Sequence, residues 1–329
     1  MTHLKNTKVI LIIMFLIPAF ASISQEINQQ KVQELIKYND SLYASEVLIL
    51  HKGKKIVYWS DTTCDISVMY TASMLKSWTG LAFGTLIDHG FIKNIDQKVC
   101  EWLPEWADGC AKNVTLRHLL TMSAGFRRRG GNSGVLAQSD NNLYVLNSKL
   151  DYSPGMKFDY SNESVQLLGI ILERASGMDA YSYFEKYLFQ PLEMNSTHLV
   201  RDRSGKNWVT YGGCITTIND VSKIGQLVLN KGKFGDRQVI SEKWITESLQ
   251  PSSLASYYGY LWWLDYKYSA HQNISAMGDP GNMMIIFPKS DLIFIRSQTC
   301  KTDLNSHPEY CSSKWMGVAF INKISGIMN

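Results

Sequence analysis

The sequence predicts an α+β fold in which both ends of the chain build one antiparallel sheet and a helical region is inserted between them. Two observations support this fold class. Short apolar, β-prone runs lie near the amino terminus and again in the carboxyl third, whereas approximately residues 77–240 carry mostly helical periodicity. The chain has 329 residues, of which 45% are hydrophobic, so a sizeable core can form. We expect one domain over residues 22–329, with helices flanking the sheet.

The first 21 residues are predicted to be a secretory signal peptide. Lys5 and Lys8 precede an apolar run over residues 9–20, and Ala19-Phe20-Ala21 offers a small-x-small cleavage site. The run is short for a bilayer span, so a retained anchor is the less favoured alternative. Cleavage after Ala21 predicts a periplasmic or secreted protein with no stable membrane span.

The charge balance and residue spacing narrow the range of partners. The formal charge of +4 falls to +2 once Lys5 and Lys8 leave with the signal peptide, which is too small to favour nucleic acid or an anionic membrane surface. No Cys-x-x-Cys or His-x-x-x-His spacing occurs, so neither a metal nor another cofactor is expected. A small-molecule substrate is the partner that we expect.

The cysteines fit an oxidising compartment, because all six lie in the mature part of the chain. Two pairs are near neighbours and each pair can close a short loop. The remaining two cysteines either form a disulfide with each other or stay as free thiols, and the sequence does not decide the pairing. The near pairs are Cys100 with Cys110 and Cys300 with Cys311, and the remaining two are Cys64 and Cys214.

The mature chain begins with a predicted helix and a β-hairpin. Residues 29–43 carry helix-like periodicity. Residues 47–50 and 56–59 are apolar, β-prone runs on either side of His51-Lys52-Gly53-Lys54-Lys55, which is typical of a hairpin. A second helix is predicted through residues 78–87, where apolar residues recur at helical spacing before Gly90.

Helices then dominate until strands return in the carboxyl third. Pro104, Pro154 and Pro191 mark connections between the helical segments. The later predicted helices cover residues 115–122, 162–175, 181–188, 220–230, 241–250 and 315–327. The later predicted strands cover residues 258–264, 283–287 and 292–295.

Ser73 and Lys76 form the first candidate catalytic pair. Ser73 lies at or near a helix start, and Lys76 follows one turn later on the same face. A serine hydroxyl is a poor nucleophile, but a lysine amine can activate it if burial and the helix end lower the lysine pKa. The Ser73 N–H, unpaired at the helix start, can help to bind an oxyanion. Read alone, Ser-x-x-Lys is weak evidence, and a capping serine with a solvated lysine is the alternative.

A second motif, Tyr160-Ser161-Asn162, opens the helix over residues 162–175. Tyr160 can relay a proton if its hydroxyl lies near Ser73 and Lys76. The Asn162 amide can hydrogen-bond a substrate or Lys76. The alternative for this motif is a buried tyrosine beside a capping asparagine.

A third stretch, residues 276–282, precedes a strong predicted strand and contains Gly278, Asp279 and Gly281. Glycines let the backbone approach a ligand closely. An exposed N–H here can be a second oxyanion donor. The alternative is an ordinary glycine-rich turn between strands.

In order and spacing, the three stretches together resemble the serine β-lactamase and penicillin-binding protein superfamily, over nearly the whole mature chain. The resemblance is to the branch with class C β-lactamases, esterases and 6-aminohexanoate-oligomer hydrolases. It implies the β-lactamase-like fold. The other stretches that carry it are residues 115–126, 183–194, 212–217 and 260–263.

The resemblance also implies a role for each candidate residue. Ser73 would be the acylated nucleophile and Lys76 its general base. Tyr160 would relay a proton to the leaving group. The backbone N–H groups of Ser73 and Asp279 would form the oxyanion hole. The substrate-binding positions would be Asn162, Gly278 and Asp279.

One departure from the superfamily's pattern affects the expected substrate. Its third motif usually begins with Lys or His followed by Thr or Ser, which bind a substrate carboxylate, whereas Ala276 and Met277 stand here. This favours an ester or simple amide over a β-lactam or D-alanyl peptide. The run Arg127-Arg128-Arg129 can supply charge instead, but a solvated basic turn is the favoured interpretation.

The sequence therefore predicts an exported serine hydrolase that cleaves an ester or amide through an acyl-enzyme. The first alternative is a β-lactamase or D-alanyl-D-alanine carboxypeptidase. The second is a catalytically silent protein of the same fold that binds peptidoglycan or another ligand. The presence of Ser73, Lys76 and Tyr160 argues against silence, because a binding module needs none of the three.

Overall fold

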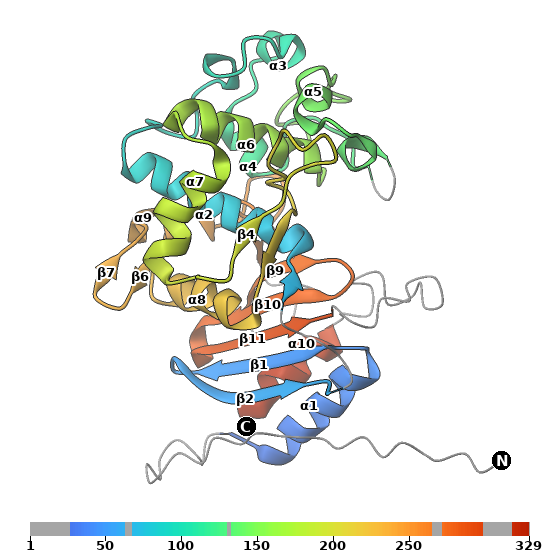
Figure 1. The fold of residues 1–329 in the computed structure, drawn as a ribbon, viewed down its shortest axis with the longest axis vertical. Helices are drawn as coiled ribbons and strands as arrows, with labels where there is room; N and C mark the ends of the chain where they lie inside the picture. The colour runs from blue at the N-terminus through green and yellow to red at the C-terminus, as the bar shows by residue number, and fades with distance from the viewer. Residues whose placement is uncertain (1–26, 63–67, 130–132, 265–271, 299–317, 329) are drawn as a thin grey trace, which may run out of the picture.

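A six-stranded antiparallel sheet forms the lower half of the molecule in Figure 1, with the strand order β2-β1-β11-β10-β9-β8. The computed structural model describes residues 27–62, 68–129, 133–264, 272–298 and 318–328, so the predicted signal peptide lies outside them. Because β1 pairs with β11, the sheet joins both ends of the chain, and the predicted α+β fold is confirmed. The strand bounds are β1 Glu46–His51, β2 Lys54–Ser60, β8 Trp263–Leu264, β9 Ile274–Gly278, β10 Asn282–Phe287 and β11 Leu292–Ser297.

The sheet separates two hydrophobic layers, because successive side chains of a strand point to opposite faces. In β1, Val47 and Ile49 belong to the layer that contains helices α1 and α10. The alternate residues Leu48 and Leu50 belong to the larger layer beneath the helical region. Burial on both faces explains why β1 reads as a continuous apolar run rather than an alternating one. The two helices are α1 Gln29–Ser41 and α10 Val318–Ser325.

The first and last described segments meet on the α1 and α10 face of the sheet. The Asn28 N–H donates to the Ile327 carbonyl at 2.8 Å. Asn28 is also the N-cap of α1, since its side chain accepts from the Lys31 N–H at 3.0 Å. Figure 1 shows α1 and the C-terminus at the same end of the molecule, below the sheet.

The helical region is organised around α2 (Leu75–Asp88), which is buried from Leu75 to Leu86. Glycine on this helix permits close packing, because a Cβ on Gly84 would lie 2.2 Å from the Trp244 ring. The Trp244 indole also donates to the Gly80 carbonyl at 3.0 Å. The other helices are α3 Ala107–Ala111, α4 Leu116–Leu120, α5 Asn141–Leu146, α6 Asn162–Ser176, α7 Ala180–Phe184, α8 Ile218–Leu229 and α9 Glu242–Ser248. The short strands beside them are β3 Met69–Tyr70, β4 His198–Leu199, β5 Cys214–Thr216, β6 Lys233–Phe234 and β7 Arg237–Gln238.

Two predicted helices differ from the structure where the backbone leaves α geometry. The helix predicted over residues 181–188 is α7 followed by the π-helical turn Glu185–Phe189. The helix predicted over residues 115–122 ends at Leu120, because Met122 has a positive φ of 56°. The other predicted helices that lie within the described residues are present, with ends within a few positions.

Two predictions near β8 and β9 are corrected. The strand expected over residues 258–264 is reduced to β8, because the chain turns back at Leu261, where φ is 63°. Residues 276–278, which were not included in a predicted strand, form the end of β9, which pairs with β8 and β10, so the alternative of a turn at these residues is wrong. Ser275, Ala276 and Gly278 carry little intrinsic β-propensity, so ladders on both sides make this a strand.

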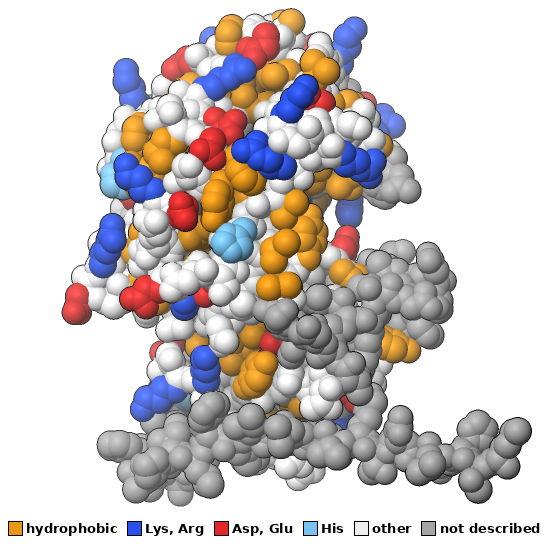
Figure 2. All heavy atoms as spheres, in the orientation of Figure 1, with side chains coloured by type: hydrophobic (Ala, Val, Ile, Leu, Met, Phe, Trp, Pro, Cys, Tyr) orange, Lys and Arg blue, Asp and Glu red, His pale blue; other side chains and the backbone are white. Residues whose placement is uncertain are grey.

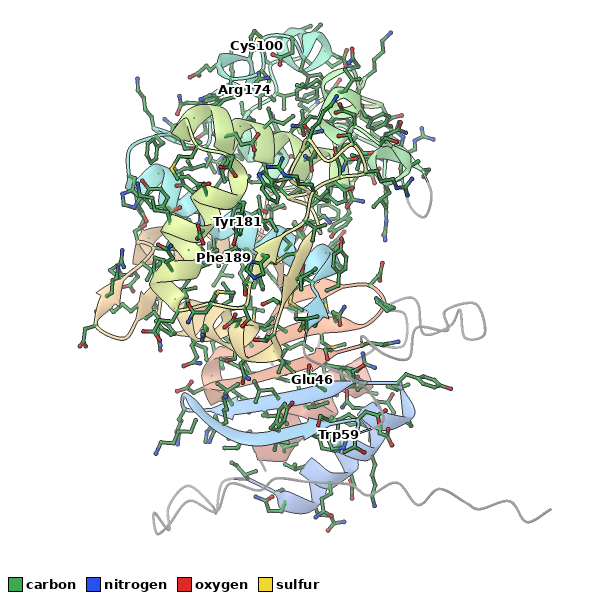
Figure 3. The ribbon with its side chains drawn as sticks, viewed as in Figure 1. Glu46, Trp59, Cys100, Arg174, Tyr181 and Phe189 are labelled. Carbon is green, nitrogen blue, oxygen red and sulfur yellow. A yellow bond between two sulfur atoms is a disulfide. The ribbon has the colours of Figure 1, made fainter. Side chains whose placement is uncertain are left out.

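Of the predicted cysteine pairs, Cys100–Cys110 is a disulfide. Figure 3 shows Cys100 at the tip of the helical region, at the opposite end from Trp59 of the sheet. Cys214 is a buried free thiol, whose pKa is raised by burial. Cys64, Cys300 and Cys311 lie outside the described residues. Among the residues that are described, no helix is long and apolar enough to cross a membrane.

Candidate active site

Ser73 lies where a short strand turns into the central helix. It is in the 3-10 helix Ala72–Met74, which leads directly into α2, so the predicted helix start is confirmed. On one side, the Thr71 N–H donates to the Cys214 carbonyl at 2.9 Å and extends the pairing of β3 with β5. On the other side β9 packs closely, because a Cβ on Gly278 would lie 2.1 Å from the Thr71 carbonyl oxygen. Ser73 is therefore held between two sheets.

Lys76 lies directly behind Ser73 and is 1% exposed. Its Nζ donates to Ser73 Oγ at 2.9 Å and to the Tyr211 carbonyl at 2.6 Å. Burial lowers the pKa of Lys76 to about 7, because the charged ammonium loses its hydration, while Asp279 and Glu163 partly oppose this shift. The pair thus combines a hydroxyl with an amine of which about half is neutral at pH 7 and most is neutral at higher pH.

Tyr160 lies on the pocket side of this pair, immediately before α6. The Lys76 Nζ lies 5.1 Å from the centroid of its ring. The ring stacks on Trp263 with centroids 5.6 Å apart, so its position is fixed by the β8 edge of the sheet. Burial raises the pKa of Tyr160 above its ordinary value, and an interaction with the Ser73 side chain partly lowers it. The phenol therefore keeps its proton at neutral pH.

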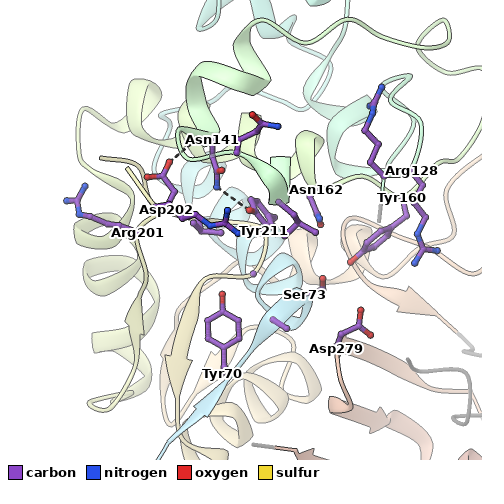
Figure 4. A pocket seen from close by; sticks show the side chains of 17 residues that line it. Tyr70, Ser73, Arg128, Asn141, Tyr160, Asn162, Arg201, Asp202, Tyr211 and Asp279 are labelled. Atoms are coloured by element: carbon purple, nitrogen blue, oxygen red, sulfur yellow. Dashed lines mark hydrogen bonds between the residues drawn. The ribbon is translucent and has the colours of Figure 1, made fainter. Parts of the chain in front are cut away.

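A cavity of about 370 Å³ opens over these groups, and Figure 4 shows Ser73 near its base. Ser73, Tyr160, Asn162 and Asp279 line it, so the structure brings together four of the six predicted site residues at one surface. The two others are not among its lining residues. Lys76 is buried behind Ser73, and Gly278 makes its close approach to the backbone of Thr71.

The turn that carries Asp279 is tied to the rest of the sheet by two buried polar side chains that the sequence reading did not single out. Asn282 Nδ2 donates to the Tyr70 carbonyl at 2.8 Å, and its Oδ1 accepts from the Gln298 N–H at 2.8 Å. The Arg296 guanidinium, 0% exposed, donates to the Gly281 carbonyl at 2.6 Å. These bonds fix the spacing between the Ser73 segment and the turn. The sequence does contain one sign of this role, because Arg296 is a charged residue inside the otherwise apolar strand β11.

The first two positions of the third motif place no side chain at the pocket, as the sequence predicts. Ala276 and Met277 are 0% and 8% exposed, and each belongs to one of the two hydrophobic layers. Neither lines the cavity. Charge comes instead from the helical region, where Arg128 and Arg129 line the cavity together with Arg201 and Arg203. The basic turn is solvated as expected, since Arg127 and Arg128 are exposed, but the Arg128 and Arg129 side chains also line the cavity.

The comparison with protein families agrees with this geometry. The family model described as "Beta-lactamase" matches residues 39–306, which is most of the chain. The chain belongs to the β-lactamase family. Its resemblance to the serine β-lactamase and penicillin-binding protein superfamily is confirmed, and it is a hydrolase of the β-lactamase-like fold.

Individual relatives show which part of the chain is shared. A β-lactamase of Yersinia enterocolitica is 29% identical over 140 residues, which is 43% of this chain and 36% of that protein. The 6-aminohexanoate-dimer hydrolase of Paenarthrobacter ureafaciens is 23% identical over 283 residues, which is 75% of this chain and 68% of that protein. The chain thus spans about a third of the length of the first relative and two thirds of the second.

Solved structures share the same fold. EstCE1, described as a hydrolase with promiscuous acyltransferase activity, superimposes with a TM-score of 0.71 at 17% identity, covering 91% of this chain and 97% of EstCE1. At this identity the likeness concerns the fold alone. Among the described residues, no group of three or more His, Cys, Asp or Glu side chains is placed to hold a metal ion.

Proposed function

We propose that this protein is an exported serine hydrolase that cleaves an ester or amide through an acyl-enzyme on Ser73. One observation carries the proposal: Lys76 Nζ lies 2.9 Å from Ser73 Oγ, is buried, and has a pKa lowered to about 7 at the base of an open cavity. A structural lysine on a helix surface would have neither the burial nor the shifted pKa.

These groups provide a path for the proton in both acylation and deacylation of Ser73. The neutral Lys76 amine accepts the Ser73 proton while Oγ bonds to the substrate carbonyl carbon. The N–H groups of Ser73 and Asp279 stabilise the resulting oxyanion. Tyr160, protonated because its pKa is raised, donates to the leaving oxygen or nitrogen and regains a proton from the Lys76 ammonium. Water then attacks the acyl-enzyme with the same groups working in reverse, and Asn162 contacts the bound substrate.

The chemistry of the third motif favours an ester or amide over a β-lactam or D-alanyl peptide. With Ala276 and Met277 packed into the core, β9 offers a substrate only backbone groups. The relative that matches 75% of this chain is named a 6-aminohexanoate-dimer hydrolase, not a β-lactamase. A β-lactamase is the second candidate, because Arg128 places a cation at the cavity that a substrate carboxylate can use.

The test uses Ser73→Ala, with Ser153→Ala as the matched control because Ser153 is exposed and does not line the cavity. We expect Ser73→Ala to abolish hydrolysis of 4-nitrophenyl butyrate and labelling by a fluorophosphonate, while the circular dichroism spectrum stays unchanged. The control retains both. Unchanged turnover in folded Ser73→Ala protein would reject the acyl-enzyme on Ser73. A higher kcat/KM for nitrocefin than for the butyrate would favour the β-lactamase instead.

Export rests on the amino-terminal sequence and is supported by the Cys100–Cys110 disulfide, since such bonds persist in oxidising compartments. We expect a protein expressed in a bacterial host with its full amino terminus to be recovered from the periplasm, beginning at Ser22. Edman or mass-spectrometric sequencing of the purified protein measures this. Recovery of an uncleaved chain from the membrane fraction would instead support the retained anchor.

A further inference from the structure

The cavity has a positively charged side that the reaction steps do not use. Four guanidinium groups line it, but two of them are already engaged. Arg129 forms an ion pair with Asp151 at 3.1 Å, and Arg201 stacks on Trp208 at 3.9 Å while donating to the Lys206 carbonyl. Figure 2 shows several Lys and Arg side chains over the helical region on the face in view.

The acidic groups of the cavity offset only part of this charge, because two carboxylates, Asp202 and Asp279, line it beside the four guanidinium groups. Asp202 is fully engaged, because its carboxylate accepts from the backbone or side chain of Asn141, Ser204 and Asn207. Asp279 is the carboxylate nearest the reacting groups, and within the described part of the chain it forms no ion pair. An anionic ligand group would thus meet more guanidinium groups than carboxylates in the cavity.

Arg128 is the guanidinium that combines an open charge with closeness to the reacting groups. Among the described residues its guanidinium has no ion pair and no hydrogen bond, and it lies over the Tyr160 ring, 5.7 Å from the centroid. Lys76 lies over the same ring. Burial raises the pKa of Asp279 and the Arg128 charge opposes this rise, whereas at Lys76 burial lowers the pKa and the Arg128 charge adds to this lowering.

The loop holds Arg128 in place through its backbone. The Arg128 N–H donates to Asp159 Oδ1 at 2.9 Å, and Asp159 is paired with Lys157 at 3.1 Å. The Arg127 N–H likewise donates to Asp151 at 2.9 Å, but Arg127 does not line the cavity. Figure 4 shows Arg128 beside Tyr160 and Arg201 at the opposite side of the cavity, with Ser73 between them in this view.

We infer that Arg128 binds a carboxylate carried by the substrate, so that the preferred esters or amides of this enzyme are anionic. The inference rests on the proposed function and deepens it. The guanidinium takes over, from the helical side of the cavity, a task for which Ala276 and Met277 provide no side chain. A planar guanidinium suits it, because it can donate two parallel hydrogen bonds to one carboxylate.

The experiment compares esters that differ only in charge. One pair places the charge on the acyl side, mono-4-nitrophenyl adipate and its methyl ester, and the other on the leaving group, 4-acetoxybenzoate and its methyl ester. We expect the anionic member of at least one pair to have a kcat/KM about tenfold higher, as one charge-assisted contact provides. The pair that shows the preference identifies the side on which the carboxylate sits.

The variants assign the preference to a residue. In Arg128→Gln the ratio of kcat/KM between the anionic and the neutral ester of the pair should fall to about one, whereas the matched control Arg127→Gln should retain the preference. In 1 M salt the preference of the wild type should shrink, because the screening length falls to about 3 Å. Arg203→Gln tests the other cavity arginine for which no partner is found among the described residues.

The outcomes separate the inference from the proposed function. If no ester is hydrolysed and Ser73 is not labelled, the proposed function fails. If neutral esters are hydrolysed without an anionic preference, or if the preference survives in Arg128→Gln, only the inference is overturned. Loss of the preference in Arg203→Gln with retention in Arg128→Gln would also overturn it, by moving the carboxylate site to Arg203.

Discussion

The two walls of the cavity are built in opposite ways. The sheet-side wall, formed by Ser73 and the turn that carries Asp279, is fixed by buried contacts such as those of Lys76 behind Ser73 and of Asn282. The helical-side wall, formed by residues 128–129 and 201–203, presents charged side chains of which several are exposed. Reacting atoms need positions fixed to a fraction of an ångström, whereas a charge on a long side chain can adapt to its ligand. Chemistry and substrate choice are thus separated.

This contrast predicts that changes in the sheet-side wall reduce kcat for every substrate, whereas changes in the helical-side wall redistribute kcat/KM among substrates. The largest effect is expected at Lys76. Lys76→Met removes the base without adding volume, and we expect kcat/KM for 4-nitrophenyl butyrate to fall about 10³-fold. Lys243→Met, an exposed lysine far along the chain, is the control. A loss below tenfold in folded protein would mean that another group accepts the Ser73 proton.

The next largest effect sharpens the role of Tyr160. Tyr160→Phe keeps the ring on Trp263 but removes the proton donor, so the loss depends on the leaving group. We expect about 10²-fold lower kcat/KM for a 4-nitroanilide, whose nitrogen must be protonated, and less than tenfold for the 4-nitrophenyl ester. Tyr257→Phe is the control because Tyr257 also stacks on Trp263. Equal losses for the two substrates would contradict a relay to the leaving group.

Gly278→Ala tests whether the sheet-side wall depends on close backbone packing. The new Cβ would lie 2.1 Å from the Thr71 carbonyl oxygen, which cannot move without shifting Ser73. We expect the free energy of unfolding to fall by about 1–3 kcal/mol, measured by urea denaturation, and kcat to fall with it. Gly326→Ala is the control, because its Cβ would meet no atom within 4 Å. Full stability and activity in Gly278→Ala would mean that β9 is not tightly packed on the Ser73 segment.

The smallest expected effect is a shift in the pH dependence of kcat/KM, because charges on both walls act on the Lys76 amine. Below about pH 7 the Lys76 amine becomes protonated and cannot accept a proton, so kcat/KM for a neutral ester should fall with pH. Arg128→Gln removes a charge that disfavours the ammonium and should move this limb to higher pH. Asp279→Asn removes a charge that favours it and should move the limb to lower pH. Shifts in the same direction for both variants would contradict this electrostatic assignment.

Local patterns in the sequence predicted the sheet-side chemistry because helix starts carry local signals. Ser73 and Lys76 are three residues apart, and Tyr160 and Asn162 stand together at the start of α6. The contacts that position them are not local. Lys76 donates to Tyr211, 135 positions away, and Asn282 donates to Tyr70, 212 positions away. Such pairs depend on the assembled fold, so no periodicity or spacing in one sequence reveals them.

The helical-side wall was predicted least well, for a related reason. A run of three arginines has no internal feature that tells a solvated turn from a cavity wall. Asp151 and Asp159 determine where the arginine side chains lie, because these carboxylates accept hydrogen bonds from the backbone N–H groups of Arg127 and Arg128 and so orient the loop. The weak β-propensity around Ala276 hid β9 in the same way, since its stability comes from strands on both sides.

The hydrogen bond between Asn28 and Ile327 has a consequence for how the domain can be attached. Both described ends emerge together on the α1 and α10 face of the sheet, whereas Ser73 lies on the opposite face, where its 3-10 helix packs on β9. A partner protein, resin or surface joined to either end therefore holds the domain from behind. Immobilised in this way, the enzyme would keep its cavity turned toward the surrounding solution. Because the two ends are adjacent, the domain could also be inserted into a loop of a host protein through two short linkers.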